Sequence, residues 1–579
     1  MTLSKRKFLS LFSAIAVAVS GTITFAQSTA IYSGLDRVHP VVAENGMVAA
    51  QEKVAARVGL NILQAGGNAV DASVAVGFAL AVTLPRAGNL GGGGFMIVHD
   101  AKAGSTNAID YREMAPAAAF RDMYLDASGE PVKNRSRFHG LAIGVPGTVA
   151  GMEMALQQYG SMSLSQVIAP AIKLARDGIV VTTSLSNNLK RAEERLKRWP
   201  QTAAVFYKPD GGFYEAGEIF KQPDLAHTLE LIAEFGADGF YRGEIAQKIA
   251  AAVQAAEGMI TVADMGAYHA VLRDTVSGTY RGYDIHSMPP PSSGGTHIVQ
   301  ILNTLEGYPI ADLGANSAQT IHLMAEAMKQ AYADRATYLG DADFVDVPVN
   351  ELTDKQYASD IRTAIDMGKA RPAVQVKAST LTPYESNETT HYSVVDRFGN
   401  AVSNTYTINF SYGSGIVATG TGVLMNNEMD DFSAKSGVAN AYGLIGGDAN
   451  AVEAGKRPLS SMSPTIVMKD GKVFLVTGSP GGSRIITTTL QVLMNVIDHK
   501  MNISEATLAP RIHHQWLPDE LRVEEGISAD TKAILRAKGH DVVVKRTMGA
   551  VQSIMVDPET GVLLGSTDLR RTGSSVEGY

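Results

Sequence analysis

Residues 388–396 read Glu388-Thr389-Thr390-His391-Tyr392-Ser393-Val394-Val395-Asp396, and their alternating pattern predicts a β-strand. The strand begins at a threonine, whose hydroxyl is a poor nucleophile at neutral pH. A free α-amine has a pKa of about 7.7 to 8.0 and can accept the hydroxyl proton. Cleavage of the Glu388–Thr389 bond would create such an amine beside the Thr389 hydroxyl. Thr389 is therefore a candidate nucleophile, although the strand preference of threonine alone also explains a Thr-Thr pair.

A short turn follows this strand. Residues 397–399 are Arg-Phe-Gly, and the glycine suits a position with positive φ. A three-residue loop pairs Asp396 with Asn400 and places Thr389 opposite Thr407, so that Thr407 and Asn409 share the face of Thr389. A four-residue loop would shift the register by one residue and move both side chains off that face.

Composition limits the classes of function. The chain has 579 residues, a formal net charge of -8 and no cysteine. The length favours two or more domains or one large layered fold. The negative charge argues against nucleic acid or an anionic membrane as the main partner, and the lack of cysteine excludes disulfides, thiol nucleophiles and cysteine metal sites. A small soluble substrate is expected.

The N-terminus has the pattern of a secretory signal peptide. Residues 5–7 are Lys-Arg-Lys, the run 8–25 is mainly apolar, and Ala26 ends it with a small residue. We expect residues 1–26 to be removed and the protein to be exported to the periplasm, with the medium left open. A retained anchor is the alternative, but polar residues interrupt the apolar run, so no stable membrane insertion is expected.

The remaining chain changes character near residue 389. Residues 49–84 have a helical pattern interrupted at Gly66-Gly67-Asn68, and residues 163–177 and 317–332 have the pattern of amphipathic helices. Arg112 ends a predicted strand at 107–112. Residues 389–408, 465–478 and 552–566 are strand-rich. Helices and strands of this kind suggest sheets covered by helices, an α+β class.

Several motifs, in order along the chain, carry a family resemblance. They are residues 66–72 (Gly-Gly-Asn-Ala-Val-Asp-Ala), 87–95 (Ala-Gly-Asn-Leu-Gly-Gly-Gly-Gly-Phe), 111–113 (Tyr-Arg-Glu), 289–295 (Pro-Pro-Pro-Ser-Ser-Gly-Gly), 388–407, 426–432 (Asn-Asn-Glu-Met-Asp-Asp-Phe), 457–464 (Arg-Pro-Leu-Ser-Ser-Met-Ser-Pro) and 478–483 (Gly-Ser-Pro-Gly-Gly-Ser). Together they resemble the γ-glutamyltranspeptidases, a family of self-cleaving N-terminal-nucleophile hydrolases. The resemblance covers essentially the mature chain. Without it, the glycines at 91–94 fit no nucleotide motif and indicate close packing.

The resemblance implies the fold and its processing. It implies a four-layer αββα sandwich, the N-terminal-nucleophile hydrolase fold, with stacked central antiparallel sheets covered by helices. It also implies that residues 27–388 and 389–579 become a large, mainly helical subunit and a small, strand-rich subunit. The two would form a heterodimer that shares one fold.

The resemblance also implies roles for the reacting groups. Thr389 is the expected nucleophile, and Thr407 the residue that hydrogen-bonds to its hydroxyl. Backbone N–H groups of Gly481 and Gly482 would hold the developing oxyanion, because glycine lets a backbone approach closely.

A γ-glutamyl group carries an α-carboxylate and an α-ammonium, and the matching positions offer partners for both. Arg112, Ser460 and Ser461 suit the carboxylate. Asn409, Glu428 and Asp431 suit the ammonium. Tyr442 resembles the lid tyrosine of bacterial members of the family, although an ordinary surface loop explains it equally well.

The expected reaction is transfer of the γ-glutamyl group of glutathione or a related γ-glutamyl amide to water, an amino acid or a peptide. No cofactor is expected. No metal is expected either, because adjacent histidines such as His513-His514 rarely chelate one ion. Two alternatives remain: an acylase of the same superfamily that acts on glutaryl-type side chains such as those of cephalosporins, and an exported amino-acid-binding protein without catalysis.

Overall fold

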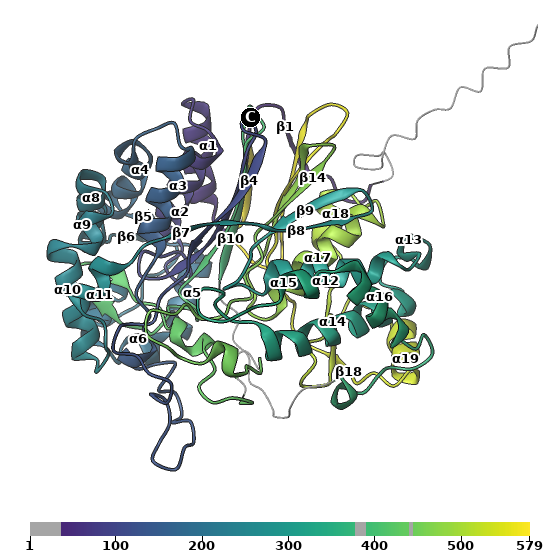
Figure 1. Cartoon of the computed structure of the whole chain (residues 1–579). Coiled ribbons are helices and arrows are strands. Elements are labelled where there is room, and N and C mark those ends of the chain that lie inside the picture. The colour runs from purple at the N-terminus through teal and green to yellow at the C-terminus, as the bar shows by residue number, and fades with distance from the viewer. Residues whose placement is uncertain (1–35, 377–388, 439, 441–443) are drawn as a thin grey trace, which may run out of the picture.

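Two seven-stranded sheets lie face to face in the computed structural model, which describes residues 36–376, 389–438, 440 and 444–579. Helices cover the outer face of each sheet, so the layers follow the order helix, sheet, sheet, helix (Figure 1). The predicted α+β, four-layer αββα sandwich is confirmed.

The first sheet contains the strand that follows Thr389. Its order is β21 (Ser575–Gly578), β2 (Met47–Ala50), β10 (Thr390–Val395), β11 (Ala401–Thr407), β3 (Gly93–Asp100), β4 (Ser105–Tyr111) and β7 (Val271–Asp274). All neighbours pair antiparallel. The β10–β11 hairpin thus lies between two strands, β2 and β3, from the other end of the chain.

The second sheet faces the first across an apolar layer. Its order is β1 (Val41–Ala43), β20 (Leu563–Thr567), β19 (Gln552–Val556), β15 (Lys472–Thr477), β14 (Thr465–Lys469), β9 (Tyr283–Ser287) and β8 (Val276–Tyr280). Phe95, Ile97 and Val395 of the first sheet and Ile466 and Ile554 of the second belong to one buried cluster between the sheets. Burial of this cluster stabilises the stacking.

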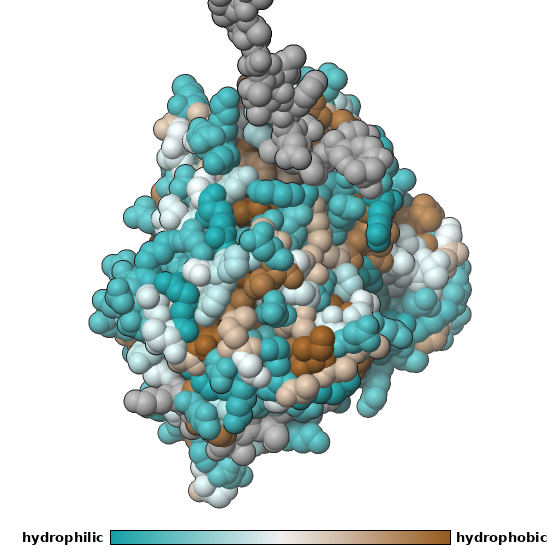
Figure 2. All heavy atoms as spheres, turned by 90° about the vertical axis from the view of Figure 1, so that its right-hand side faces the viewer, coloured by the Kyte–Doolittle hydropathy of each residue, from teal (hydrophilic) through white to brown (hydrophobic). Residues whose placement is uncertain are grey.

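Two helical layers complete the sandwich. The helices whose buried residues join the core on the first sheet include α1 (Lys53–Gln64), α2 (Ala69–Thr83), α3 (Thr148–Tyr159), α4 (Leu164–Asp177), α8 (Pro223–Phe235) and α10 (Gly243–Ala255). Those on the second sheet include α12 (Gly294–Glu306), α14 (Ala318–Tyr338), α17 (Arg484–Ile497), α18 (Ile503–Leu508) and α19 (Ala529–Ala537). Helix α1 buries one side and exposes the other, whereas α2 is buried along its whole length. The exposed face of the second layer is mainly hydrophilic, with hydrophobic residues interspersed (Figure 2).

Shorter elements connect these layers. They are α5 (Thr183–Arg191), α6 (Glu193–Leu196), α7 (Pro200–Phe206), α9 (Asp238–Tyr241), α11 (Val262–Ala267), α13 (Ile310–Leu313), α15 (Val349–Leu352), α16 (Lys355–Thr363), β5 (Ile179–Val180), β6 (Ile219–Phe220), β12 (Val417–Ala418), β13 (Val423–Leu424), β16 (Ile512–His513), β17 (Leu521–Val523) and β18 (Val542–Val544). In the described part of the chain, no helix combines the length and the apolar character needed to cross a bilayer.

The predicted helical region 49–84 begins too early. Ala49 and Ala50 end strand β2, which pairs with β10, and helix α1 starts only at Lys53. Pairing with the central strand overrides the helical pattern of these small residues. The predicted break at Gly66-Gly67-Asn68 is confirmed, because Asn68 caps helix α2 by accepting hydrogen bonds from the backbone of Val70 and Asp71.

The turn of the β10–β11 hairpin has the predicted register. The backbone N–H of Asp396 donates to the carbonyl of Asn400 over 3.1 Å, and Thr390 pairs with Tyr406. Gly399 has a φ of +87°, a conformation that glycine adopts without strain. One more step along this ladder sets Thr389 opposite Thr407.

Candidate active site

A recess opens at the start of strand β10. It encloses about 320 Å³, counted to its open mouth. The side chains and backbone that line it are Arg112, Arg335, Thr389, Thr407, Asn409, Glu428, Asp431, Leu444, Ser460, Ser461, Met462, Gly482, Ser483 and Ile485. The structure therefore brings together most of the predicted site residues. Gly481 directly precedes the lining residue Gly482, whereas Glu388, Tyr442 and the signal peptide at 1–26 lie outside the described residues.

Thr389 and Thr407 face each other across the hairpin. Their Oγ1 atoms are 3.3 Å apart, and both residues are buried. The N–H of Asn409 donates to the Thr407 hydroxyl over 2.9 Å, which directs that hydroxyl. A hydroxyl held in this way can donate to, or accept from, the Thr389 hydroxyl.

The glycine loop before β3 holds this hairpin from the side. A Cβ atom at Gly92 would lie 2.1 Å from the Thr407 carbonyl oxygen, closer than real contacts allow. Asn89 donates from Nδ2 to the same oxygen over 3.0 Å. The structure thus supports the interpretation of these glycines as close packing.

Gly481 and Gly482 lead into helix α17, which begins at Arg484. Their φ angles are +141° and +60°, which favours glycine at both positions. N–H groups at a helix N-terminus lack partners within the helix and lie at the positive end of its dipole. Backbone donors at this end of α17, which borders the recess, can stabilise a developing oxyanion.

The charged residues of the recess contact one another. Arg112 directly follows β4, as predicted. Its Nη1 bonds to Glu428, its Nη2 donates to Asp431 over 2.5 Å and its Nε donates to the Pro458 carbonyl over 3.1 Å. The predicted carboxylate partner and two of the predicted ammonium partners therefore form one ion-pair cluster in this state.

Burial makes these carboxyl groups hard to ionise. It raises the pKa of Glu113, beside Arg112, to about 7, and it raises the pKa values of Glu428 and Asp431, while the Arg112 guanidinium opposes all three shifts. An incoming ammonium group would favour their ionised forms. The carboxyl groups of the cluster are thus suited to bind a cation that lies beside Arg112.

Arg335 is the charged lining residue that the sequence analysis missed. It lies in the last turn of α14 and donates from Nη2 to the Ser461 hydroxyl over 3.4 Å. Its neighbour Ser460 accepts at its carbonyl from the backbone N–H and the hydroxyl of Ser293. The predicted serines thus lie beside a second arginine. The sequence shows only an arginine near the end of a helix, and its burial, which is uncommon for arginine, is seen in the structure alone.

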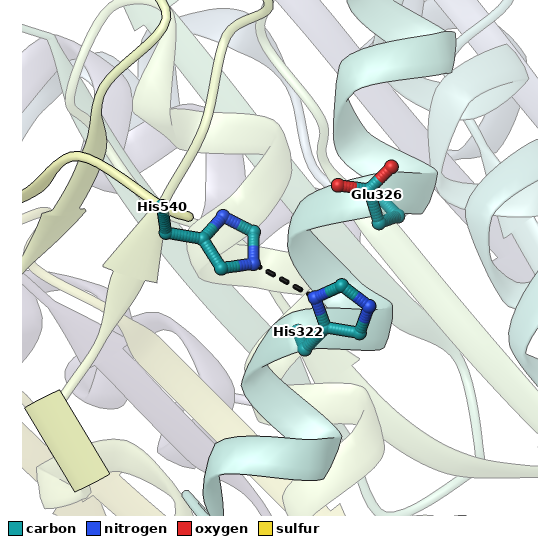
Figure 3. A group of neighbouring side chains, drawn as sticks. All are labelled: His322, Glu326 and His540. Atoms are coloured by element: carbon teal, nitrogen blue, oxygen red, sulfur yellow. Dashed lines mark hydrogen bonds between the residues drawn. The ribbon is translucent and has the colours of Figure 1, made fainter. Parts of the chain in front are cut away.

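One group outside the recess has the residue types of a metal site. His322 and Glu326 lie one turn apart on α14, and His540 approaches from the segment before β18 (Figure 3). One ligand atom of each residue lies within 4.8 Å of the others.

Hydrogen bonds already use these atoms. His322 Nε2 lies 2.8 Å from the Asp366 carbonyl, to which it must donate, so its Nδ1 accepts from His540 Nε2, also at 2.8 Å. Lys329 donates to Glu326 over 2.7 Å, which sets a cation beside the carboxylate. The arrangement favours a hydrogen-bonded core network over a metal centre.

His513 and His514 are also held by hydrogen bonds or ion pairs. His513 Nδ1 lies 2.9 Å from the Thr487 hydroxyl, and His514 Nε2 lies 3.2 Å from Asp519. Another recess, of about 1200 Å³, lies beside α1 and α5 and contains none of the described residues that were predicted for the site. The larger of these two recesses therefore lacks the predicted site residues.

A family model described as gamma-glutamyltranspeptidase matches residues 55–578. The chain belongs to this family. It is 57% identical to the glutathione hydrolase proenzyme of Escherichia coli (strain K12), over 94% of this chain and 93% of that protein. The predicted family, and the prediction of an enzyme of this family, are confirmed.

Solved structures of the γ-glutamyltranspeptidase family and its neighbours have the same fold. The crystal structure of a cephalosporin acylase from Bacillus halodurans gives a TM-score of 0.81 at 30% identity, over 95% of this chain and 98% of that chain. A chain of Helicobacter pylori gamma-glutamyltranspeptidase gives a TM-score of 0.55 at 48% identity, over 56% of this chain and 93% of that chain.

Proposed function

We propose that this protein is a self-processing glutathione hydrolase and γ-glutamyltransferase whose nucleophile is Thr389. The observation that carries the proposal is the position of the Thr389 hydroxyl. It lies 3.3 Å from the Thr407 hydroxyl, in a recess that also contains Arg112, Glu428 and Asp431.

The first stage is cleavage of the precursor. The Thr389 hydroxyl oxygen attacks the Glu388 carbonyl carbon, the C–N bond breaks, and the nitrogen takes up a proton to become the α-amine of Thr389. Water then hydrolyses the ester and gives residues 27–388 and 389–579. The name proenzyme of the E. coli relative supports this stage. The H. pylori chain supports it too, because 93% of that chain matches only 56% of this chain, as expected for one of two cleaved fragments.

The second stage is acyl transfer. The new α-amine accepts the proton of the Thr389 hydroxyl, which attacks the γ-carbonyl of the donor, and the amine of the leaving group departs with a proton. N–H groups of Gly481 and Gly482 would stabilise the oxyanion. Water or the amine of an amino acid or peptide then attacks the γ-glutamyl ester and regenerates Thr389.

The charges of the recess match a γ-glutamyl donor. Glu428 and Asp431, with Asn409, offer oxygen atoms to the α-ammonium, and the cationic side with Ser460 and Ser461 offers donors to the α-carboxylate. Cationic and anionic side chains that lie side by side fit an α-carbon that carries both an ammonium and a carboxylate. Glutathione carries this group and is the donor that we propose.

The proposed location is the periplasm. It rests on the signal-peptide pattern of residues 1–26. An exported hydrolase would meet γ-glutamyl compounds outside the cytoplasm.

The similarity to the B. halodurans acylase makes a glutaryl-type acylase the second candidate. A glutaryl group lacks the α-ammonium, so it would leave Glu428 and Asp431 without a cationic partner from the substrate. A non-catalytic amino-acid-binding protein is the third candidate. The presence of Thr389, Thr407 and both glycines favours catalysis over binding alone.

A comparison of γ-glutamyl and glutaryl p-nitroanilides separates these candidates. We expect kcat/KM to be at least about 100-fold higher for the γ-glutamyl donor, because the glutaryl donor leaves buried acceptors unpaired. Equal or faster release from the glutaryl anilide would identify an acylase. Tight binding of glutamate by calorimetry, with neither anilide cleaved, would identify a binding protein.

A further inference from the structure

Gln51 contacts the start of strand β10 from the side opposite the recess. Side chains alternate along a strand, so Thr390 lies on the face of β10 that packs against the helices, together with Tyr392 and Val394. Gln51 directly follows strand β2 and is 1% exposed. It is a buried polar residue beside the strand of the proposed nucleophile, and it does not line the recess.

The neighbours of Gln51 fix the orientation of its amide. Arg86 Nη2 and Arg571 Nη1 each lie 3.0 Å from the same terminal atom of this side chain. A guanidinium only donates hydrogen bonds, so this atom is the amide oxygen. The amide nitrogen then donates to the Thr390 hydroxyl over 2.9 Å. Gln51 thus joins two arginines to the residue that follows the proposed nucleophile.

The neighbouring strands hold this end of β10 unequally. The ladder with β11 begins at Thr390, whereas the ladder with β2 begins at Tyr392, opposite Ala50. The first two residues of β10 therefore extend beyond the β2 ladder. The side chain of Gln51, the next residue after Ala50, supplies a hydrogen bond on this side.

The two arginines connect Gln51 to other parts of the chain. Arg86 lies just after helix α2, and Arg571 lies in the segment before β21. The Arg86 carbonyl also accepts from the backbone N–H of Tyr412 over 3.0 Å, three residues after Asn409 of the recess. Gln51 therefore links the start of β10 to segments that border the site from behind.

We propose that Gln51 is a positioning residue for both proposed reactions of Thr389, and that it acts through the Thr390 hydroxyl. Its hydrogen bond fixes the backbone at Thr390 and, through it, the direction of the Thr389 hydroxyl toward the carbonyl that it attacks. A small displacement of an attacking group costs rate. This inference rests on the proposed function, because it assumes that Thr389 is the nucleophile.

The test removes the contact from each end. Gln51→Met keeps the length of the side chain without its hydrogen bonds, and Thr390→Val keeps the shape without the hydroxyl. In each variant we expect the rate of precursor cleavage and kcat with γ-glutamyl p-nitroanilide to fall about 10-fold, because one hydrogen bond is lost. KM should change less than about twofold, because the contacts of the recess with the donor are untouched.

The double variant tests whether Gln51 acts through Thr390. When Thr390→Val has removed the hydroxyl, Gln51→Met has no further contact with β10 to break. We therefore expect the double variant to be no slower than Thr390→Val alone.

Conservative variants should preserve the rates. Thr390→Ser retains the hydroxyl, and Gln51→Glu retains an acceptor for both arginines and can accept from the Thr390 hydroxyl. Both should keep kcat within about threefold of wild type. Gln356→Met, an exposed substitution on α16, is the matched control and should behave as wild type. If Gln51→Met does not fold, Thr390→Val against Thr390→Ser measures the same contact.

The outcomes separate this inference from the proposed function. If wild type neither cleaves itself at Thr389 nor releases the anilide, the proposed function fails and this inference fails with it. If wild type does both, but the losses of the two single variants multiply in the double variant, or Thr390→Val is as fast as Thr390→Ser, the inference alone is wrong. Slow single variants with unchanged KM, and no further loss in the double variant, support it.

Discussion

Thr407 lies against the proposed nucleophile, with 3.3 Å between the two hydroxyl oxygens. Thr407→Val keeps the shape of the side chain and removes its hydroxyl. We expect kcat to fall about 10- to 100-fold, because a net hydrogen bond at a reacting group is lost. The rate of precursor cleavage should fall in parallel. Both rates are measured at neutral pH, by anilide release and by gel electrophoresis.

Thr407→Ser is the matched control, because it retains the hydroxyl. It should keep most of the wild-type rate. A valine variant as fast as the serine variant would show that the Thr407 hydroxyl does not act on Thr389.

Single residues differed in how well the sequence predicted them. Thr389 and Thr407 were predictable because both lie in one hairpin, whose turn fixes which side chains face each other. The contact of Arg112 with Glu428 and Asp431 was not, because it joins segments more than 300 positions apart. Arg335 was missed for the same reason: only the packing of α14 against the segment at Ser461 brings it into the recess.

At the scale of elements, strand β10 contains a buried histidine between the sheets. His391 bonds through Nδ1 to the Thr405 hydroxyl over 2.8 Å and through Nε2 to the Ser393 hydroxyl over 3.1 Å. Burial lowers its pKa from about 6.5 to about 3. As the pH falls, His391 therefore takes up a proton in the unfolded chain before it does so in the folded chain. The stability that neutral His391 supports is present above about pH 6.5 and is lost on acidification toward pH 3.

His391→Gln should weaken this dependence on pH. Between pH 7 and pH 5 the free energy of unfolding should fall by about 2 kcal/mol less in the variant than in its parent, a difference of one proton. Urea unfolding in a Thr389→Ala background keeps the chain in one piece. His227→Gln, an exposed substitution on α8, is the control and should follow its parent. Identical pH dependence in His391→Gln and its parent would contradict the assignment.

Elements were predictable where local pattern and tertiary pairing agree. Asn68 and Ser163 cap helices at the expected positions, since a cap is a local signal. Residues 49–50 were predicted wrongly because their strand is specified by pairing with β10, some 340 positions away. The four-layer arrangement came from the family resemblance, not from periodicity, and the order of the strands in each sheet was not predicted.

The whole molecule interleaves the two parts of the chain that cleavage would separate. Strands β10 and β11 lie between β2 and β3, and β14 pairs with β9 in the other sheet. Separation of the parts would break both sheets and expose the core between them. We therefore expect the cleaved fragments to co-elute in size-exclusion chromatography and to separate only in denaturant.

A matched experiment produces residues 27–388 and residues 389–579 as two separate chains and examines the folding of each. Each alone should aggregate or lack native structure, because neither has a complete sheet. Two fragments that separate in native buffer and remain folded would contradict a shared core.

The central claim is that Thr389 becomes the new amino terminus and the nucleophile. Its most direct test is intact mass and N-terminal sequencing of the purified protein after incubation at neutral pH, with Thr389→Ala beside it. We predict two fragments in the wild type, one of which begins at Thr389, and a single inactive chain in the variant. A folded wild-type chain that stays whole and still releases the anilide, or an alanine variant that is cleaved and active, would contradict the claim.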